Sequence, residues 1–134
     1  MYLKEDSLYL NGIFDMVSHN MSVSYTDVLC FTKDNFLNTF LNIYKVKDKK
    51  LELVEENNNL KELLISLFDI KDKELNRILY LLEKECGKYN KTYSFKENKI
   101  YDYLDRKTYF YFLEDIYFIE FDKKVICIMI GNNE

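Results

Sequence analysis

The C-terminal part of the chain contains three closely spaced runs of residues that favour β-strands, at 109–113, 116–121 and 125–130. Only Glu114-Asp115 and residues 122–124 separate these runs, and connections this short require consecutive strands to pair antiparallel. Apolar side chains occupy both even and odd positions of the last two runs, whereas a sheet with one face in water carries polar residues at every second position. The sequence therefore predicts a three-strand meander whose two faces must both be covered, by helices, by further strands or by a partner.

Shorter strand signals lie upstream of the meander. Residues 22–31 alternate in the manner of a strand buried mainly on one face, and Leu51-Glu52-Leu53 has the weak alternation of a short edge strand. Two aromatic pairs also have strand composition, namely Tyr93 with Phe95 and Tyr101 with Tyr103. We therefore expect one or two N-terminal strands to join the C-terminal sheet.

A pair of helices is predicted in the middle of the chain. Asn59 and Glu62 have the spacing of a capping box, in which the Asn side chain accepts a hydrogen bond from a first-turn N–H. Apolar residues follow at helical spacing, at Leu60, Leu63, Leu64, Leu67 and Phe68. A second apolar stripe ends at Gly87 and contains Leu75, Ile78, Leu79, Leu82 and Cys86. Because the link between the two stripes is short, the helices are expected to pack antiparallel.

The N-terminal region supports two interpretations. Behind a cap at Asp6 or Ser7, residues 7–18 carry apolar side chains at helical spacing, yet Asn11-Gly12 is also the dipeptide that two-residue hairpin turns prefer. The helix accounts for more residues and is favoured. A further helix is expected behind a cap at Thr32 or Asp34, and its inner face comprises Phe36, Leu37, Phe40, Leu41 and Tyr44.

These signals together predict an α+β fold. The expected architecture is an antiparallel sheet, made of the C-terminal three-strand meander plus one or two N-terminal strands, packed against an antiparallel helical pair and one or two further helices. Residues 1–134 contain neither an internal repeat nor a linker long enough to divide them, so we expect a single domain.

The bulk composition narrows the classes of function. A net charge of −4 has the wrong sign for a protein that binds nucleic acid mainly by neutralising phosphates. No apolar run approaches the length of a membrane span, and the acidic start does not resemble a secretory signal, so a cytoplasmic protein without membrane contact is expected. Cys30, Cys86 and Cys127 are odd in number and set among apolar residues, which favours buried thiols over disulfides.

Signals for catalysis are few. His19 is the single histidine, so a Cys–His nucleophile pair or an ordinary zinc site has little support, and no cofactor or metal is expected. Gly12, Gly87 and Gly131 lie too far apart in sequence to form one phosphate-binding loop. The acid-x-Lys pattern at residues 122–124 recurs several times in this lysine-rich chain and is interpreted as a turn.

The concentration of aromatic residues is the most unusual positive signal. Twelve of the 22 aromatic side chains lie in residues 89–121, and acidic residues surround them. Tyrosine is enriched in protein interfaces, and a surface that mixes tyrosine with acids suits a basic partner. The predicted protein-binding residues are Tyr109, Tyr111, Glu114, Asp115, Tyr117, Glu120 and Asp122.

Three classes of function therefore stay open. The favoured one is a small acidic, non-catalytic inhibitor or regulator that neutralises a partner protein, for example a basic, nucleic-acid-directed effector. Immunity proteins, antitoxins and anti-defence proteins, including the anti-CRISPR type, belong to this class, and self-association into a homodimer is a variant of it. The second class binds single-stranded nucleic acid through the aromatic strands, with Lys107, Lys123 and Lys124 beside the tyrosines. The third is a small enzyme that uses His19 or carboxylate and tyrosine chemistry.

Overall fold

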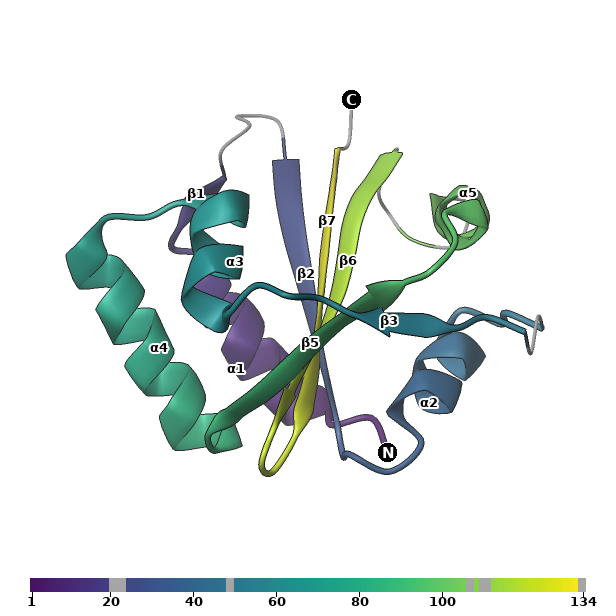
Figure 1. Ribbon diagram of the computed structural model, residues 1–134, viewed down its shortest axis with the longest axis horizontal. Coiled ribbons are helices and arrows are strands. Elements are labelled where there is room, and N and C mark those ends of the chain that lie inside the picture. Colours follow the sequence, from purple (N-terminus) through teal and green to yellow (C-terminus); the bar gives the residue numbers. More distant parts are fainter. Residues whose placement is uncertain (20–23, 48–49, 106–107, 109–111, 133–134) are drawn as a thin grey trace.

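A computed structural model of the chain describes residues 1–19, 24–47, 50–105, 108 and 112–132 (Figure 1). Its main feature is a five-stranded antiparallel sheet in the order β2-β7-β6-β5-β3. The strands of this sheet are β2 (Ser24–Phe31), β3 (Leu53–Glu55), β5 (Tyr89–Phe95), β6 (Phe112–Phe121) and β7 (Val125–Asn132). The helices are α1 (Lys4–Phe14), α2 (Phe36–Ile43), α3 (Leu60–Leu67), α4 (Asp72–Cys86) and α5 (Lys99–Asp105). Two short strands, β1 (Ser18–His19) and β4 (Phe68–Asp69), pair separately. The predicted α+β class with an antiparallel sheet is confirmed.

Both faces of the sheet are covered by helices of the same chain. One apolar cluster joins the sheet to α1, α3 and α4, and the other joins it to α2 and α5. Figure 1 shows these two groups of helices on opposite sides of the strands. Strand β7 contributes to both clusters, with Ile126, Ile128 and Ile130 on one face and Val125, Cys127 and Met129 on the other. The two-sided apolar pattern therefore required two helical layers and no partner.

Strand β2 differs from the prediction of burial on mainly one face. Val28 and Cys30 lie in the cluster under α1, while Leu29 and Phe31 lie in the cluster under α2, and all four are buried. The alternation of small polar and apolar residues in the first half of β2 had suggested that one face of this strand is exposed to solvent. Its second half pairs with the buried strand β7 and shares both helical layers.

The predicted break between residues 109–113 and 116–121 is wrong. Strand β6 runs through Glu114-Asp115, and the pairing with β7 shifts by one residue between Leu113 and Asp115, which is a β-bulge. A bulge admits one extra residue without ending the strand, so a local pair of acids did not mark a turn. The antiparallel meander is formed by β5, β6 and β7, and residues 109–111 lie outside the described part.

Tyr101 and Tyr103 lie in a helix and not in a strand. Helix α5 buries Ile100 and Leu104, which are spaced one helical turn apart. The strand prediction followed the aromatic composition, whereas the burial of these two residues has helical spacing. Tyr93 and Phe95 lie in β5, as expected. The predicted edge strand is β3, at Leu53–Glu55 and so two residues later than expected.

Residues 4–14 form a helix, which confirms the favoured N-terminal interpretation over the hairpin. Neither Asp6 nor Ser7 caps it, because α1 already begins after Leu3. The cap expected for α2 is also wrong, since Asn35 precedes that helix in a left-handed conformation with φ 54°. Thr32 has another partner: its hydroxyl oxygen accepts a hydrogen bond from the N-terminal ammonium group at 2.7 Å.

The helical pair α3 and α4 agrees closely with the sequence. The side chain of Asn59 accepts a hydrogen bond from the Glu62 N–H at 2.8 Å, and its amide donates to the Glu62 carboxylate at 2.9 Å. The Glu62 carboxylate accepts this second bond from the side-chain amide of Asn59, whereas in a standard capping box it accepts from the backbone N–H of the N-cap residue. Figure 1 shows α3 and α4 running in opposite directions. Gly87 ends α4 with a φ of 90°, a conformation that favours glycine.

Helix α1 closes the outer edge of the sheet as well as covering a face. The side-chain amide of Asn11 donates to the Val28 carbonyl at 2.7 Å, and its oxygen accepts from the Val28 N–H at 2.9 Å. The Ser7 hydroxyl oxygen accepts from the Cys30 N–H at 2.8 Å. The Leu3 N–H donates to the Cys30 carbonyl at 2.8 Å. These bonds replace a neighbouring strand, so backbone groups of β2 that would template pairing with another chain are satisfied.

Because α1 closes this edge, we expect the loss of the Asn11 side-chain amide to have a large effect on the stability of the fold. Asn11→Ala should lower the free energy of unfolding by about 2–3 kcal/mol, because it leaves two backbone groups of Val28 without partners on a partly buried edge. Urea denaturation followed by circular dichroism measures the change. Asn76→Ala, at an exposed position of α4, is the matched control and should change stability by less than about 0.5 kcal/mol. Equal effects of the two substitutions would contradict this role of Asn11.

Candidate functional site

The predicted protein-binding residues do not form one surface in the described structure. Asp115 and Tyr117 lie on the sheet face that packs against α1, α3 and α4, and both are half-buried. Glu120 lies on the opposite face, where it pairs with Lys33 at 3.5 Å and accepts from the Tyr93 hydroxyl at 3.4 Å.

The other predicted residues lie elsewhere. Glu114 is at the bulge and Asp122 is exposed in the β6–β7 turn. Tyr109 and Tyr111 lie outside the described residues.

Asp115 and Tyr117 belong to a polar cluster where β5 and β6 separate. The last described pair between these strands is Tyr93 with Phe118. Beyond it, the Ile116 N–H donates to the Tyr101 hydroxyl at 3.3 Å instead of to β5.

Carboxylates complete this cluster and keep its tyrosines protonated. Burial, together with the nearby charges of Asp115 and Glu56, raises the pKa of Tyr117 to about 12. Burial also raises the pKa of Tyr101. Glu56 in turn accepts a hydrogen bond from the Ser94 hydroxyl. At neutral pH both tyrosine hydroxyls are therefore protonated and do not act as bases.

Three buried cysteines were considered for nucleophilic chemistry, and one of them, Cys127, lies close enough to Tyr101 to contribute to its raised pKa. Burial raises the pKa of Cys30 to about 12, that of Cys86 to about 11 and that of Cys127 well above its usual range. These thiols are protonated at neutral pH and are weak nucleophiles. The backbone of His19 pairs with Phe68, while the placement of its side chain lies outside what the structure describes. Within the described ranges, no group of three or more His, Cys, Asp or Glu side chains is arranged to hold a metal ion.

A cation from the β6–β7 turn fixes helices α1 and α4 at one end. The Lys124 ammonium lies 3.0 Å from the Asp6 carboxylate of α1 and 3.0 Å from the Glu85 carboxylate of α4. These hydrogen bonds and charges raise the pKa of Lys124, although partial burial acts in the opposite direction. Only 19% of the lysine side chain is exposed, so screening by water is reduced.

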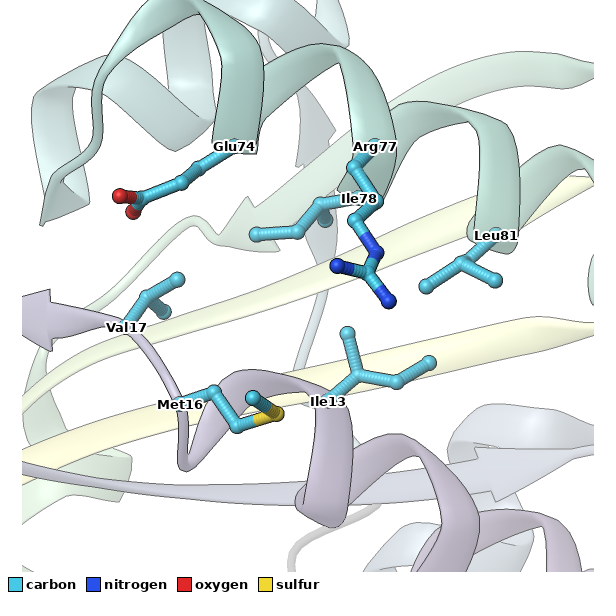
Figure 2. A pocket seen from close by; sticks show the side chains of 7 residues that line it. All are labelled: Ile13, Met16, Val17, Glu74, Arg77, Ile78 and Leu81. Carbon is cyan, nitrogen blue, oxygen red and sulfur yellow. The ribbon is translucent and has the colours of Figure 1, made fainter.

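At their other end, α1 and α4 enclose an open groove of about 320 Å³ (Figure 2). Its residues come from the C-terminal end of α1, the turn that follows it and residues 74–81 of α4, namely Ile13, Met16, Val17, Glu74, Arg77, Ile78 and Leu81. Asp6 and Glu85 meet at the start of α1 and the end of α4, whereas Val17 and Glu74 meet at the other ends. The two helices are therefore antiparallel, and the groove lies at the end away from Lys124.

The groove combines an apolar interior with a charged rim. Ile78 is buried at its base, and the side chain of Met16 is 84% exposed beside it. Figure 2 shows the Arg77 guanidinium directed toward Ile13 and Leu81, while the Glu74 carboxylate points away from it. No ion pair joins Arg77 to a carboxylate among the residues with described positions. The mouth of an apolar groove thus carries a cation without a fixed counter-charge.

The sequence pattern placed residues 7–18 and Ile78 on apolar helix faces and did not identify the groove. A usable signal was present on α4, where residues 78–82 are five consecutive apolar or aromatic residues. A helix turns by about 100° per residue, so five such residues cannot all face one core. Leu82 is buried, whereas Leu81 is half-buried in the groove and Tyr80 is 64% exposed.

Comparisons with known proteins add no assignment to this site: no family model, no curated protein and no solved structure matches the chain. Among the described residues, no helix is both long and apolar enough to cross a membrane. The groove and the polar cluster are therefore the two candidate features of this structure.

The polar cluster predicts a pH-dependent gain in stability for Asp115→Asn. Burial and the nearby Glu114 raise the pKa of Asp115, so ionisation costs more in the folded protein than in the unfolded chain. The contribution of Asp115 to the free energy of unfolding is most favourable below about pH 3.9, which is the pKa of Asp in the unfolded chain. This favourable contribution is lost as the pH rises through the pKa of Asp115 in the folded protein. At pH 7 the Asn variant should therefore melt roughly 1–3 °C higher than the unmodified protein, and the difference should shrink toward pH 4.

Thermal melts at several pH values test this expectation. Asp122→Asn, which changes an exposed carboxyl in the β6–β7 turn, is the control and should show little shift. A gain for Asp115→Asn that is independent of pH would show that burial of the charge is not its cause.

The lysine bridge gives a second stability prediction. Lys124→Met should lower the free energy of unfolding by about 1–2 kcal/mol, because two charged hydrogen bonds are lost and two carboxylates are left facing each other. Chemical denaturation at low and high salt measures it, and the effect should diminish at high salt. Lys123→Met changes the exposed neighbour and should be close to neutral. If both substitutions cost the same, the bridge does not stabilise the fold.

Proposed function

We propose that this protein acts without catalysis, by binding another protein and inhibiting or regulating it, and that the groove between α1 and α4 is the contact surface. The single observation that carries this proposal is an open apolar groove with a protruding methionine and a guanidinium at its mouth. Contiguous apolar surface with a polar rim is typical of protein interaction sites.

Other side chains on the same helices support a contact surface there. Leu8 and Tyr9 of α1 are 65% and 49% exposed, and Tyr80 of α4 is 64% exposed. Single exposed apolar residues are ordinary on protein surfaces, but here they accompany a groove between the same two elements. Methionine suits such a surface because its flexible, polarisable side chain adapts to the shape of a partner.

The strand residues predicted from sequence support binding less directly. Their acidic groups are divided between two faces of the sheet, and Glu120 is already paired with Lys33. Lys124, which the nucleic-acid hypothesis placed beside the aromatic strands, is held by two carboxylates, and Tyr117 is half-buried. A basic partner and a role in neutralising an effector stay predictions.

The test is site-specific photo-crosslinking in the cells that make the protein. A photoreactive residue at position 16 should capture one protein, whereas the same residue at the exposed position 97, in the β5–α5 connection, should not. The purified partner should then bind with a measurable Kd, lose activity on binding, and bind Met16→Lys at least about tenfold more weakly, because a cation would enter the apolar groove. Failure of the wild-type chain to capture or co-purify any protein would overturn the proposal.

A further inference from the structure

We infer that the groove between α1 and α4 receives a single amphipathic helix of the partner protein, with an acidic residue of that helix placed against Arg77. This inference rests on the proposed function and specifies the chemistry of the partner. It follows from the shape of the groove, the state of the sheet edges and the charge at the groove mouth.

The walls of the groove are a face of α4 and the end of α1 with its following turn, and no third helix of the described residues lines it. On α4 the lining residues at positions 74, 77, 78 and 81 follow the spacing of one helical face. The second wall is formed by Ile13, at the end of α1, and by Met16 and Val17 in the turn that follows it. Two antiparallel helices with adjoining apolar stripes present the type of groove in which an amphipathic helix docks through anchors at positions i, i+3 or i+4 and i+7.

The dimensions agree with a short helical segment. Residues 74–81 advance by about 10 Å along α4, at 1.5 Å per residue, which corresponds to two helical turns of an occupant. A volume of about 320 Å³ is small and admits a few anchoring side chains. A stable dimer of two copies needs about 1,200 Å² or more of total buried surface, so this groove alone is better matched to one helix.

The sheet edges argue against docking of an extended strand. The outer edge of β2 is occupied at Val28 and Cys30 by the side chains of Ser7 and Asn11 and by the Leu3 backbone. The opposite edge is β3, which is only three residues long. Strand addition requires a row of available backbone groups, so a helix in the groove is the better-supported mode of recognition.

Arg77 defines the charge that the occupant should carry. Its guanidinium is directed toward the apolar side chains of Ile13 and Leu81 (Figure 2), and no described carboxylate is paired with it. A helix that buries the groove would remove water from this cation. A carboxylate on the occupant compensates that loss by a charge-assisted hydrogen bond, whereas a neutral side chain does so less well.

The experiment uses two synthetic helical peptides of about 15 residues, each with three leucines at helical spacing. They differ only in one residue beside the leucines, which is Glu in the first and Gln in the second. Binding to the unmodified protein should be about fivefold tighter for the Glu peptide, and Arg77→Gln should abolish this preference. Lys73→Gln removes an exposed lysine of the same helix that does not line the groove, so it should retain the preference.

Amide chemical shifts decide whether the peptides occupy the groove. Shifts should concentrate at Ile13, Val17 and Leu81. Absence of binding at millimolar peptide, shifts confined to other surfaces, or an unchanged preference in Arg77→Gln would each overturn the inference.

Two further arms identify other occupants of the groove. Decanoate carries a carboxylate on an apolar chain, and binding of decanoate without binding of either peptide would assign the groove to a small amphiphile. A concentration-dependent dimer that Arg77→Gln dissociates would assign it to a second copy of the chain. Either result would overturn docking of a partner helix.

The outcomes separate this inference from the proposed function. A partner protein that is captured through another surface, together with peptides that do not bind, would leave the proposed function standing and remove the helical occupant. If the peptides bind the groove of the purified protein but no partner protein is captured in cells, the helical occupant would stand and the proposed function would be removed.

Discussion

Burial of β7 on both faces and along both edges is the constraint on which the rest of this structure depends. Its residues 125–131 are all buried, and strands β2 and β6 pair with it on either side. Burying each large apolar side chain contributes about 1.5–3 kcal/mol, so exposing either face would remove a large part of the stability. Two helical layers are therefore necessary, and the sheet is left with edges at β2 and β3.

Helix α1 connects this constraint to the candidate site. One side of it buries Leu10 and Phe14 against the sheet, and the polar residues Ser7 and Asn11 close the edge of β2. These bonds fix the position of α1, while the Lys124 bridge holds its start near the end of α4. The apolar residues at the far end, including Ile13, are then left beside α4, and no third helix of the described residues covers them. The groove is thus a consequence of how the fold is held together.

Much of the fold could be predicted because its signals are local. The capping box at Asn59 and the leucine stripe behind it depend on residues within two helical turns of one another. The errors arose where distant contacts override local preference. Glu114-Asp115 resembles a turn, yet pairing with β7 carries the strand through it as a bulge. Tyr101 has strand composition but lies in a helix that buries Ile100 and Leu104.

The fold class, the two-sided burial of the sheet and the helical pair follow from local sequence patterns, because periodicity and capping are properties of neighbouring residues. The tertiary structure alone decided which apolar residues remain outside the core. Leu81 and Ile13 are far apart in the chain, and their meeting in one groove depends on the angle between two helices that are fixed elsewhere. Two described members of the predicted strand surface, Asp115 and Glu120, are separated for the same reason, since they lie on opposite faces of one covered sheet. Sequence determines what each segment prefers, and the packing of segments decides which side chains remain available to a partner.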